Sequence, residues 1–146
     1  MRIVPVTDDA GVLVEPDWLS KAEPVHRQLR PQLPSDYVGR LQVVFSCGAR
    51  MALVAEDAAV VAVGVWRVVE NTNEGRRLYV DDLVCDEGRR SRGAGKMLLR
   101  WLEEKAVSLG CDALSLDSGV QRSRAHQFYF REGMHIPAFC FRKALK

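Results

Sequence analysis

The sequence predicts one mixed α/β domain over residues 1–146, with elements in the order β-αα-βββ-α-β-α-β. Runs of β-branched and apolar residues alternate with segments of helical periodicity, which favours a sheet covered by helices. Pro31 and Pro34 divide the N-terminal helical stretch, because proline ends helices and favours extended backbone before it. A Gly- and Arg-rich turn after the central strands leads directly into another helix.

The N-terminal half is predicted to form a strand, two helices and a hairpin. Residues 2–7 form the first strand, and residues 16–47 form the two helices. Residues 51–56 and 60–69 are rich in valine and alanine with a short polar break between them, which is the pattern of two antiparallel strands. The polar segment 71–75 is predicted as the turn into the next strand.

The C-terminal half is predicted to alternate strands with helices. Residues 77–85 form a strand, and residues 95–109 form a helix that buries a stripe of leucine and alanine and ends at Gly110. Residues 113–117 form the next strand, and residues 123–132 form the next helix.

A final strand is predicted over residues 138–145, where aromatic and apolar residues precede the basic C-terminus. It would lie at an edge of the sheet. Because an edge strand presents unpaired backbone groups to other chains, this segment makes a homodimer possible.

Composition and charge exclude several classes of partner. With 47% hydrophobic and 27% charged residues the chain matches average globular proteins, and its net charge of +2 is too small for bulk attraction to nucleic acid. No apolar run approaches the roughly 18 residues of a membrane span. Acidic residues near the N-terminus interrupt any secretion signal. We therefore expect a cytoplasmic protein with no nucleic-acid or membrane partner.

The cysteines and histidines indicate neither a metal site nor a disulfide framework. No pair has CxxC spacing, and the three histidines are far apart in the sequence, so no metal is expected. We expect buried free thiols at the four cysteines, which are Cys47, Cys85, Cys111 and Cys140.

The segment 84–99 has the features of an anion-binding turn. An apolar strand ends, glycines and arginines follow, and helical periodicity begins, so unpaired N–H groups at the helix start can approach a diphosphate. A Walker A loop is excluded because Arg90 stands where its first glycine should be and Met97 where its Ser or Thr should be. The dinucleotide fingerprint is excluded because Leu98 replaces its third glycine.

The remaining pattern, Arg90-x-x-Gly93-x-Gly95, resembles the (Q/R)xxGx(G/A) loop of the GNAT superfamily of N-acetyltransferases. This resemblance implies a GNAT-like fold with splayed central strands. It also implies that acetyl-coenzyme A is the cosubstrate, with its diphosphate on the turn and its pantetheine arm beside the preceding strand. The cofactor-binding residues that it implies are Leu83, Val84, Cys85, Arg90, Ser91, Arg92, Gly93, Ala94, Gly95, Lys96, Arg122 and Tyr129.

A second motif supports the same resemblance. Residues 122–134 are similar to the family segment N-x-x-A-x-x-F-Y-x-x-x-G-F, in which the tyrosine, here Tyr129, protonates the departing thiolate. The alternative is that Tyr129 is a core aromatic. Arg122 stands where the family often has asparagine and is expected to hold a coenzyme phosphate or an anionic substrate instead. With this arginine in place of asparagine, residues 116–133 resemble the aminoalkylphosphonate N-acetyltransferase branch of the family.

Two carboxylates interrupt an otherwise apolar strand. Asp82 is the first candidate for the base that takes the amine proton, at a position where many GNAT members carry an acidic residue, and Asp81 is the reserve. Because side chains alternate along a strand, the two should face opposite sides unless a bulge intervenes. The alternative role is structural pairing with an arginine such as Arg67 or Arg76.

The function predicted from these motifs is transfer of an acetyl group to the primary amine of a small molecule, by direct attack in a ternary complex. Two alternatives keep the coenzyme A site: a binding module or sensor without turnover, and a protein lysine acetyltransferase. A small nucleic-acid-binding domain that uses the basic residues 89–92 ranks last.

Overall fold

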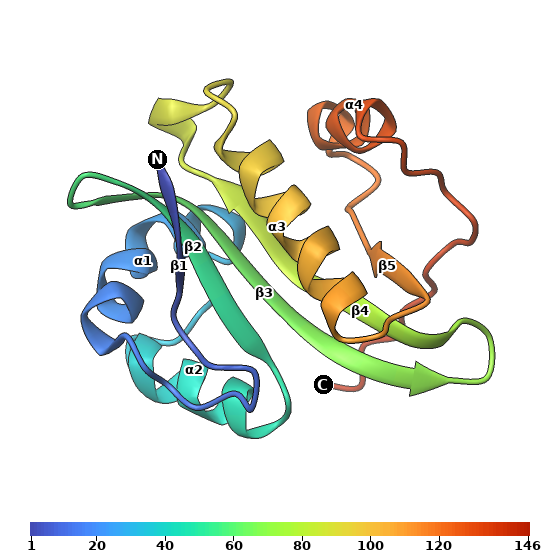
Figure 1. The fold of residues 1–146 in the computed structure, drawn as a ribbon, viewed down its shortest axis with the longest axis horizontal. Helices are drawn as coiled ribbons and strands as arrows, with labels where there is room; N and C mark the ends of the chain where they lie inside the picture. Colours follow the sequence, from blue (N-terminus) through green and yellow to red (C-terminus); the bar gives the residue numbers. More distant parts are fainter. The chain divides into compact units, whose positions relative to one another are not determined.

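The computed structural model describes all 146 residues, which form two compact units, Met1–Ser115 and Leu116–Lys146. The first unit is built on a five-stranded mixed sheet in the order β1-β2-β3-β4-β5, and the second contains helix α4 (Figure 1). In chain order the elements are β1 Arg2–Pro5, α1 Pro16–Leu29, α2 Tyr37–Ser46, β2 Arg50–Glu56, β3 Ala59–Asn71, β4 Gly75–Cys85, the 3-10 helix η1 Glu87–Arg89, α3 Ala94–Ser108, β5 Ala113–Leu116 and α4 Ser123–Arg131.

Strands β1 to β4 form an antiparallel meander. The β2–β3 turn is tight, and Asp57 takes a left-handed conformation there with φ 53°. The register of β3 against β4 shifts between Val65, opposite Asp82, and Trp66, opposite Val80. This shift is a β-bulge that leaves Asp81 without an opposite residue. β5 is tied to β4 where both strands begin, by a bond of 2.6 Å from the Asp112 N–H to the Arg76 carbonyl.

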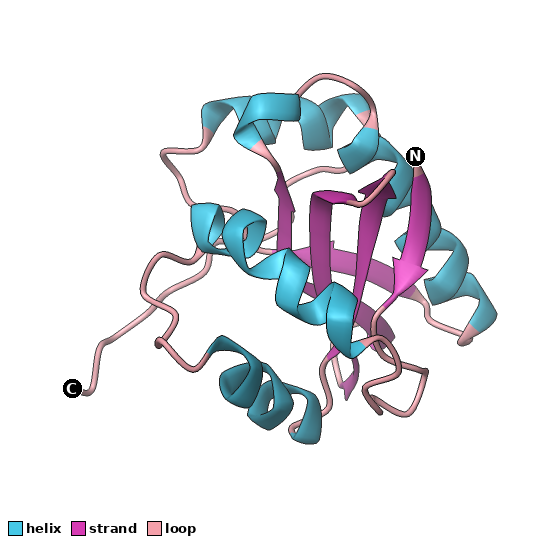
Figure 2. Cartoon of the chain, turned by 90° about the vertical axis from the view of Figure 1, so that its left-hand side faces the viewer, coloured by secondary structure: helices cyan, strands magenta, loops and turns pink.

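Helices cover both faces of the sheet (Figure 2). Helices α1 and α2 share one apolar cluster with Val63 and Val65 of β3. Helix α3 packs on the opposite face, since its Leu98 lies against Gly64 and its Trp101 ring meets the Trp66 ring at 5.3 Å. The residues that α3 buries are Ala94, Leu98, Leu99, Leu102 and Ala106.

Most predicted elements are confirmed with shifts of one to three residues at their ends. The two N-terminal helices separate at the predicted prolines. Asp36 caps the N-terminus of α2, because its carboxylate accepts the Gly39 N–H at 3.0 Å. Gly110 follows the last turn of α3 with φ 70°, a left-handed residue that the absence of Cβ permits. The mixed α/β fold class is therefore confirmed.

The predicted final strand at 138–145 was wrong. These residues have no regular structure, and their aromatic side chains are exposed, with Phe139 at 83% and Phe141 at 93%. The segment has strand-like composition, but a strand is stabilised only when another strand pairs with its backbone. The edge strand from which we inferred a homodimer is therefore absent from this structure.

The cysteine prediction was half wrong. All four thiols are free, but Cys47 and Cys140 are exposed, while Cys85 and Cys111 are half-buried. Cys47 follows the last residue of α2, and Cys140 lies in the irregular C-terminal segment, so neither has a packed layer over it. None of the helices is both long and apolar enough to span a bilayer.

Candidate active site

The turn between β4 and α3 has the backbone geometry expected of an anion cradle. Its left-handed residues are Ser91, with φ 67°, and Gly93, with φ 88°, and Gly93 is the N-cap residue directly before α3. The first bond within the helix runs from the Met97 N–H to the Gly93 carbonyl at 2.9 Å, so the N–H groups of residues 94–96 precede it. No side chain caps this helix start. The backbone is therefore presented for an anion to bind.

The arginines of the turn are paired with acidic residues. Glu56 at the end of β2 lies 2.8 Å from Arg89 and 3.8 Å from Arg92, and Glu87 lies 3.3 Å from Arg90. Arg92 keeps 63% of its side chain exposed. The predicted local excess of positive charge is thus partly neutralised, and the backbone amides become the main feature for binding an anion.

Cys85 ends β4 beside the start of α3. Burial raises the pKa of its thiol, and the Arg90 charge and the Gly95 N–H act in the opposite direction with smaller effect. The thiol therefore stays protonated near neutral pH and is a poor nucleophile. The predicted neighbours Leu83 and Val84 precede it in the strand, Leu83 half-buried and Val84 buried.

Gln28 of α1 holds the beginning of the turn. Its amide N–H donates to the Asp86 carboxylate at 3.0 Å, and its amide oxygen accepts the Glu87 N–H at 2.9 Å. Asp86 in turn lies at the N-terminus of η1 and accepts the Gly88 N–H at 3.4 Å. An exposed glutamine thus ties a helix to a loop that is far from it in the sequence.

We predict that Gln28→Ala weakens acetyl-coenzyme A binding about threefold to tenfold, as expected for the net loss of one or two hydrogen bonds that hold the turn. The measurement is calorimetric titration of wild type and variant. The matched control is Gln42→Ala on the exposed face of α2, which should leave the affinity unchanged. Equal affinities of both variants and wild type would contradict a role for Gln28.

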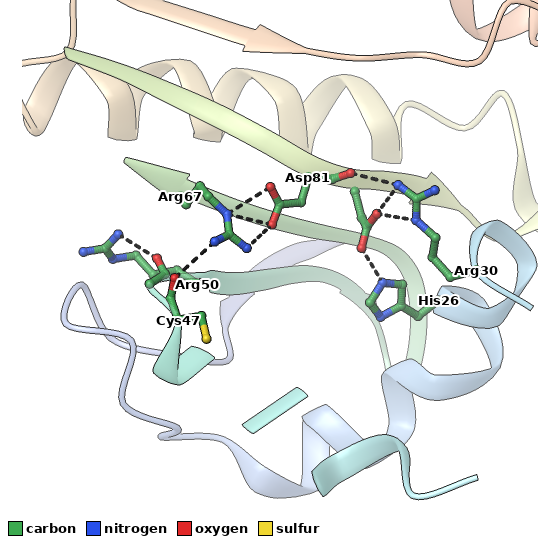
Figure 3. Close-up of polar contacts among 8 residues, drawn as sticks. His26, Arg30, Cys47, Arg50, Arg67 and Asp81 are labelled. Atoms are coloured by element: carbon green, nitrogen blue, oxygen red, sulfur yellow. Dashed lines mark hydrogen bonds and ion pairs between the residues drawn. The ribbon is translucent and has the colours of Figure 1, made fainter. Parts of the chain in front are cut away.

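The bulge in β4 places both predicted carboxylates on the face of the sheet that α1 and α2 cover. Asp82 contacts His26 of α1, and Asp81 contacts Arg67, which also reaches the Cys47 carbonyl after α2 (Figure 3). Strand alternation alone would have put the two on opposite faces. The sequence prediction allowed both carboxylates to share a face only if a bulge intervened, and the structure contains that bulge.

Asp81 is held by Arg67. The Nη2 group of Arg67 lies 2.6 Å from one carboxylate oxygen, and Nε lies within 3.1 Å of both oxygens. This hydrogen-bonded pairing raises the pKa of the guanidinium. It confirms Arg67 as the structural partner proposed for one of the aspartates, whereas Arg76 pairs with Glu70.

Asp82 is part of a buried chain of polar groups. His26 Nε2 lies 2.8 Å from one carboxylate oxygen, and His26 Nδ1 lies 2.9 Å from the Tyr37 hydroxyl. Arg30 approaches the other carboxylate oxygen through Nε at 2.7 Å and Nη2 at 2.6 Å. His26 is 1% exposed and Tyr37 2%, so both are shielded from water.

These contacts set the ionisation of the chain. Burial opposes the charged form of Asp82, but the His26 hydrogen bond and the charges of His26 and Arg30 outweigh burial and lower its pKa. Burial, with the charges of Glu23 and Asp82, raises the pKa of Tyr37 well above its ordinary value. The Tyr37 phenol therefore keeps its proton at neutral pH, and the ionised Asp82 accepts the hydrogen bond from His26 Nε2.

The second unit holds the remaining predicted residues. Arg122 precedes the first residue of α4, and Tyr129 lies in the last turns of that helix, half-buried, with its ring 5.4 Å from Phe128. A ring nitrogen of His126 lies 2.8 Å from the Gly119 carbonyl, which also accepts the Arg122 N–H at 3.0 Å. His126 therefore fastens the loop that enters α4.

A match to a known protein family agrees with the features of this site, which are the glycine-rich turn, the uncapped start of α3 and the two carboxylates of β4. The acetyltransferase (GNAT) family profile matches residues 16–134. The chain belongs to the GNAT family of acetyltransferases. Membership of this family makes the chain an enzyme of acetyl transfer.

Individual relatives of this GNAT acetyltransferase are consistent with that assignment. The uncharacterized N-acetyltransferase YhdJ of Bacillus subtilis strain 168 is 32% identical over 130 residues, 87% of this chain and 91% of the relative. The aminoalkylphosphonate N-acetyltransferase of Salmonella typhimurium is 38% identical over 66 residues, 45% and 43% of the two chains. The structure of the aminoglycoside N-acetyltransferase AAC(6')-Iy in complex with CoA shares the fold, with TM-score 0.79, 13% identity and coverage of 97% and 93%.

Sequence reasoning missed four side chains of this site, namely His26, Gln28, Arg30 and Tyr37. A signal existed for two of them. His26 and Arg30 are four residues apart on one helix, so they share a face, and a strand aspartate needs a buried cationic or donor partner. For Gln28 no signal in the sequence indicates its partner.

Proposed function

We propose that this GNAT enzyme transfers the acetyl group of acetyl-coenzyme A to the primary amine of a small molecule. The observation that carries the proposal is the helix start at residues 93–96, where a left-handed glycine presents backbone amides that no side chain caps. Such a start binds a diphosphate through backbone donors and the helix dipole. The solved neighbour in complex with CoA supports acetyl-coenzyme A as the ligand.

The proposed chemistry is direct attack. The amine nitrogen forms a bond to the thioester carbonyl carbon, the C–S bond breaks, and the electron pair leaves with sulfur as a thiolate. Placing both reactants side by side supplies much of the rate enhancement. Backbone N–H groups of Leu83, Val84 or Cys85 are proposed to stabilise the oxyanion, and Tyr129 is proposed to protonate the thiolate.

Asp82 is proposed to take the proton that the amine loses. Its lowered pKa keeps it ionised at neutral pH. An ionised carboxylate offers about four acceptor sites, and the oxygen bonded to His26 has only that one partner among the bonds described. One acceptor position therefore remains for a substrate N–H or for a water that carries the proton away. Asp81 stays the reserve, although Arg67 takes up both of its oxygens.

The first experiment is a calorimetric titration with acetyl-coenzyme A, with ATP and NAD as controls. Binding of acetyl-coenzyme A alone would support the cradle, and a panel of small amines would then be screened by release of free thiol. Absence of binding would overturn the proposed cosubstrate. Binding without turnover on any amine, together with turnover on lysine peptides, would favour a protein acetyltransferase instead.

A further inference from the structure

His26 is one of two polar side chains that the core buries, tyrosine and tryptophan aside, and the other is Thr7. It lies on α1 among apolar neighbours, since Leu19, Ala22 and Val25 of the same helix are also buried. An apolar side chain at this position would avoid the cost of removing two ring nitrogens from water. The bonds that the His26 ring makes must therefore offset that cost.

Both ring nitrogens of His26 bond to groups of other elements. Nε2 lies 2.8 Å from the Asp82 carboxylate, and Nδ1 lies 2.9 Å from the hydroxyl of Tyr37, the first residue of α2. The two aromatic rings meet edge-on with their centroids 5.7 Å apart. Turning the imidazole over would place carbon atoms against both partners and break both bonds. The ring is thus fixed with Nε2 towards the strand (Figure 3).

The His26 ring cannot act on a substrate directly. It is 1% exposed, so an acceptor amine does not reach either nitrogen. The chain behind it also offers no path for a proton to solvent, because Tyr37 is 2% exposed and its hydroxyl bonds only to His26 among the bonds described. What the ring can do is hold one oxygen of Asp82, whose side chain is 14% exposed.

The two partners of Asp82 bond to different oxygens. Arg30 contacts Oδ1 from the exposed side and neutralises the carboxylate charge. His26 contacts Oδ2 from the core, and this oxygen has that one bond among those described. The charge of Asp82 is therefore balanced without His26. The His26 bond instead fixes the direction in which the remaining acceptor positions of Oδ2 point.

We propose that His26 is a positioning residue for acetyl transfer, which holds Oδ2 of Asp82 towards the acceptor amine, and that Tyr37 fixes the His26 ring. This inference rests on the proposed function, because it takes Asp82 to accept the amine proton. When that proton passes to Oδ2, directly or through a water, the electron pair of the broken N–H bond stays on nitrogen. A carboxylate that is already held in place needs no reordering at that step.

The first measurement removes the His26 donor and then restores part of it. His26→Leu should lower kcat/KM for amine acetylation by about tenfold to 100-fold, mainly through kcat, because Asp82 then takes orientations away from the amine. His26→Gln should recover part of the loss, since its amide can donate to Oδ2. Tyr37→Phe should cost about threefold to tenfold, because it removes one bond from the ring. KM for acetyl-coenzyme A should stay within about twofold of wild type.

The pH profile separates positioning from packing. Burial raises the pKa of Asp82, and the His26 bond is the largest of the effects that lower it, so removing His26 should raise this pKa. Asp82 accepts a proton only when it is ionised. The rate of His26→Leu should therefore begin to fall at a higher pH than that of wild type on the same acceptor. The charged and titratable groups around this chain that remain in the variant are Glu23, Arg27 and Arg30 of α1, Tyr37 of α2, Arg67 of β3 and Asp81 of β4.

The control for lost stability is Val25→Ala, beside His26 on the same helix. Val25 packs in the apolar cluster, so this variant should melt at a lower temperature without a change in the pH profile. If His26→Leu does not fold, Tyr37→Phe and His26→Gln provide the same comparisons. A wild-type rate with an unshifted pH profile in the folded variants would overturn the proposal.

A double-mutant cycle tests whether His26 acts through Asp82. In the Asp82→Asn background, His26→Leu or Tyr37→Phe should lower the remaining rate by less than about twofold, because a positioning residue acts only through the group that it holds. The same loss as in the wild-type background would mean that His26 stabilises the site independently of the base, and it would refute the inference.

Carboxyl carbon NMR of Asp82 gives a readout that does not need turnover. The Asp82 resonance should titrate at a higher pH in His26→Leu than in wild type. If it does so but wild type acetylates no amine, the proposed function fails, and the catalytic role of His26 fails with it. If wild type acetylates amines and Asp82 titrates at the same pH in both proteins, the inference fails and the proposed function stands.

Discussion

Asp82→Asn is expected to lower kcat/KM for amine acetylation by about 100-fold or more, the range over which a positioned acid or base contributes to catalysis. Asparagine is nearly the same size and keeps an oxygen that can accept the His26 N–H, but it cannot take a proton. The affinity for acetyl-coenzyme A should change by less than about twofold, because the bonds described for the Asp82 side chain go to His26 and Arg30 of α1 and none reaches the cradle amides. Steady-state kinetics with thiol release and calorimetry provide the two measurements.

The matched control is Asp57→Asn in the β2–β3 turn, where the residue is exposed and has a positive φ that asparagine tolerates. It makes the same chemical change without approaching the site. A full rate in Asp82→Asn would refute the base assignment, and Asp81→Asn would then be tested in the same way. If Asp82→Asn loses activity and its melting temperature also falls strongly, the ion pair between Asp82 and Arg30 mainly stabilises the fold.

Gly93→Ala is expected to weaken acetyl-coenzyme A binding by about tenfold to 100-fold, since hydrogen bonds to charged groups contribute about 1.5–3 kcal/mol each. The residue has φ 88°, and no atom lies within 4 Å of a Cβ built there, so the added methyl group projects into open space at the cradle. In that space it would keep a phosphate from the backbone. The measurement is the dissociation constant by calorimetry.

The same substitution at the other end of α3 provides the control. Gly110 has φ 70°, and a Cβ there also meets nothing within 4 Å, so Gly110→Ala carries the same backbone strain of roughly 1–2 kcal/mol. The melting temperature should fall by a similar amount in both variants, but only Gly93→Ala should bind acetyl-coenzyme A more weakly. Similar affinities in the two variants would mean that the turn does not bind the diphosphate.

Local patterns in the chain were sufficient to predict the family and most of the fold. The loop Arg90-x-x-Gly93-x-Gly95 depends on short-range geometry, since a left-handed glycine and a helix start are set by neighbouring residues. The same holds for the proline break between α1 and α2 and for the Gly110 end of α3, which the structure confirms. The final strand failed because strand formation needs a partner, which composition does not supply.

The roles of the two aspartates depended on contacts that no local pattern contains. Asp82 meets His26 and Arg30 across more than fifty residues of sequence, and the bulge that turns Asp81 to the same face is a register shift between two strands. The sequence by itself determined that the chain has a GNAT turn and an acidic pair in the strand that precedes it. Only the tertiary structure decided which groups neutralise that pair, because side chains from distant segments become neighbours through packing of the helices on the sheet.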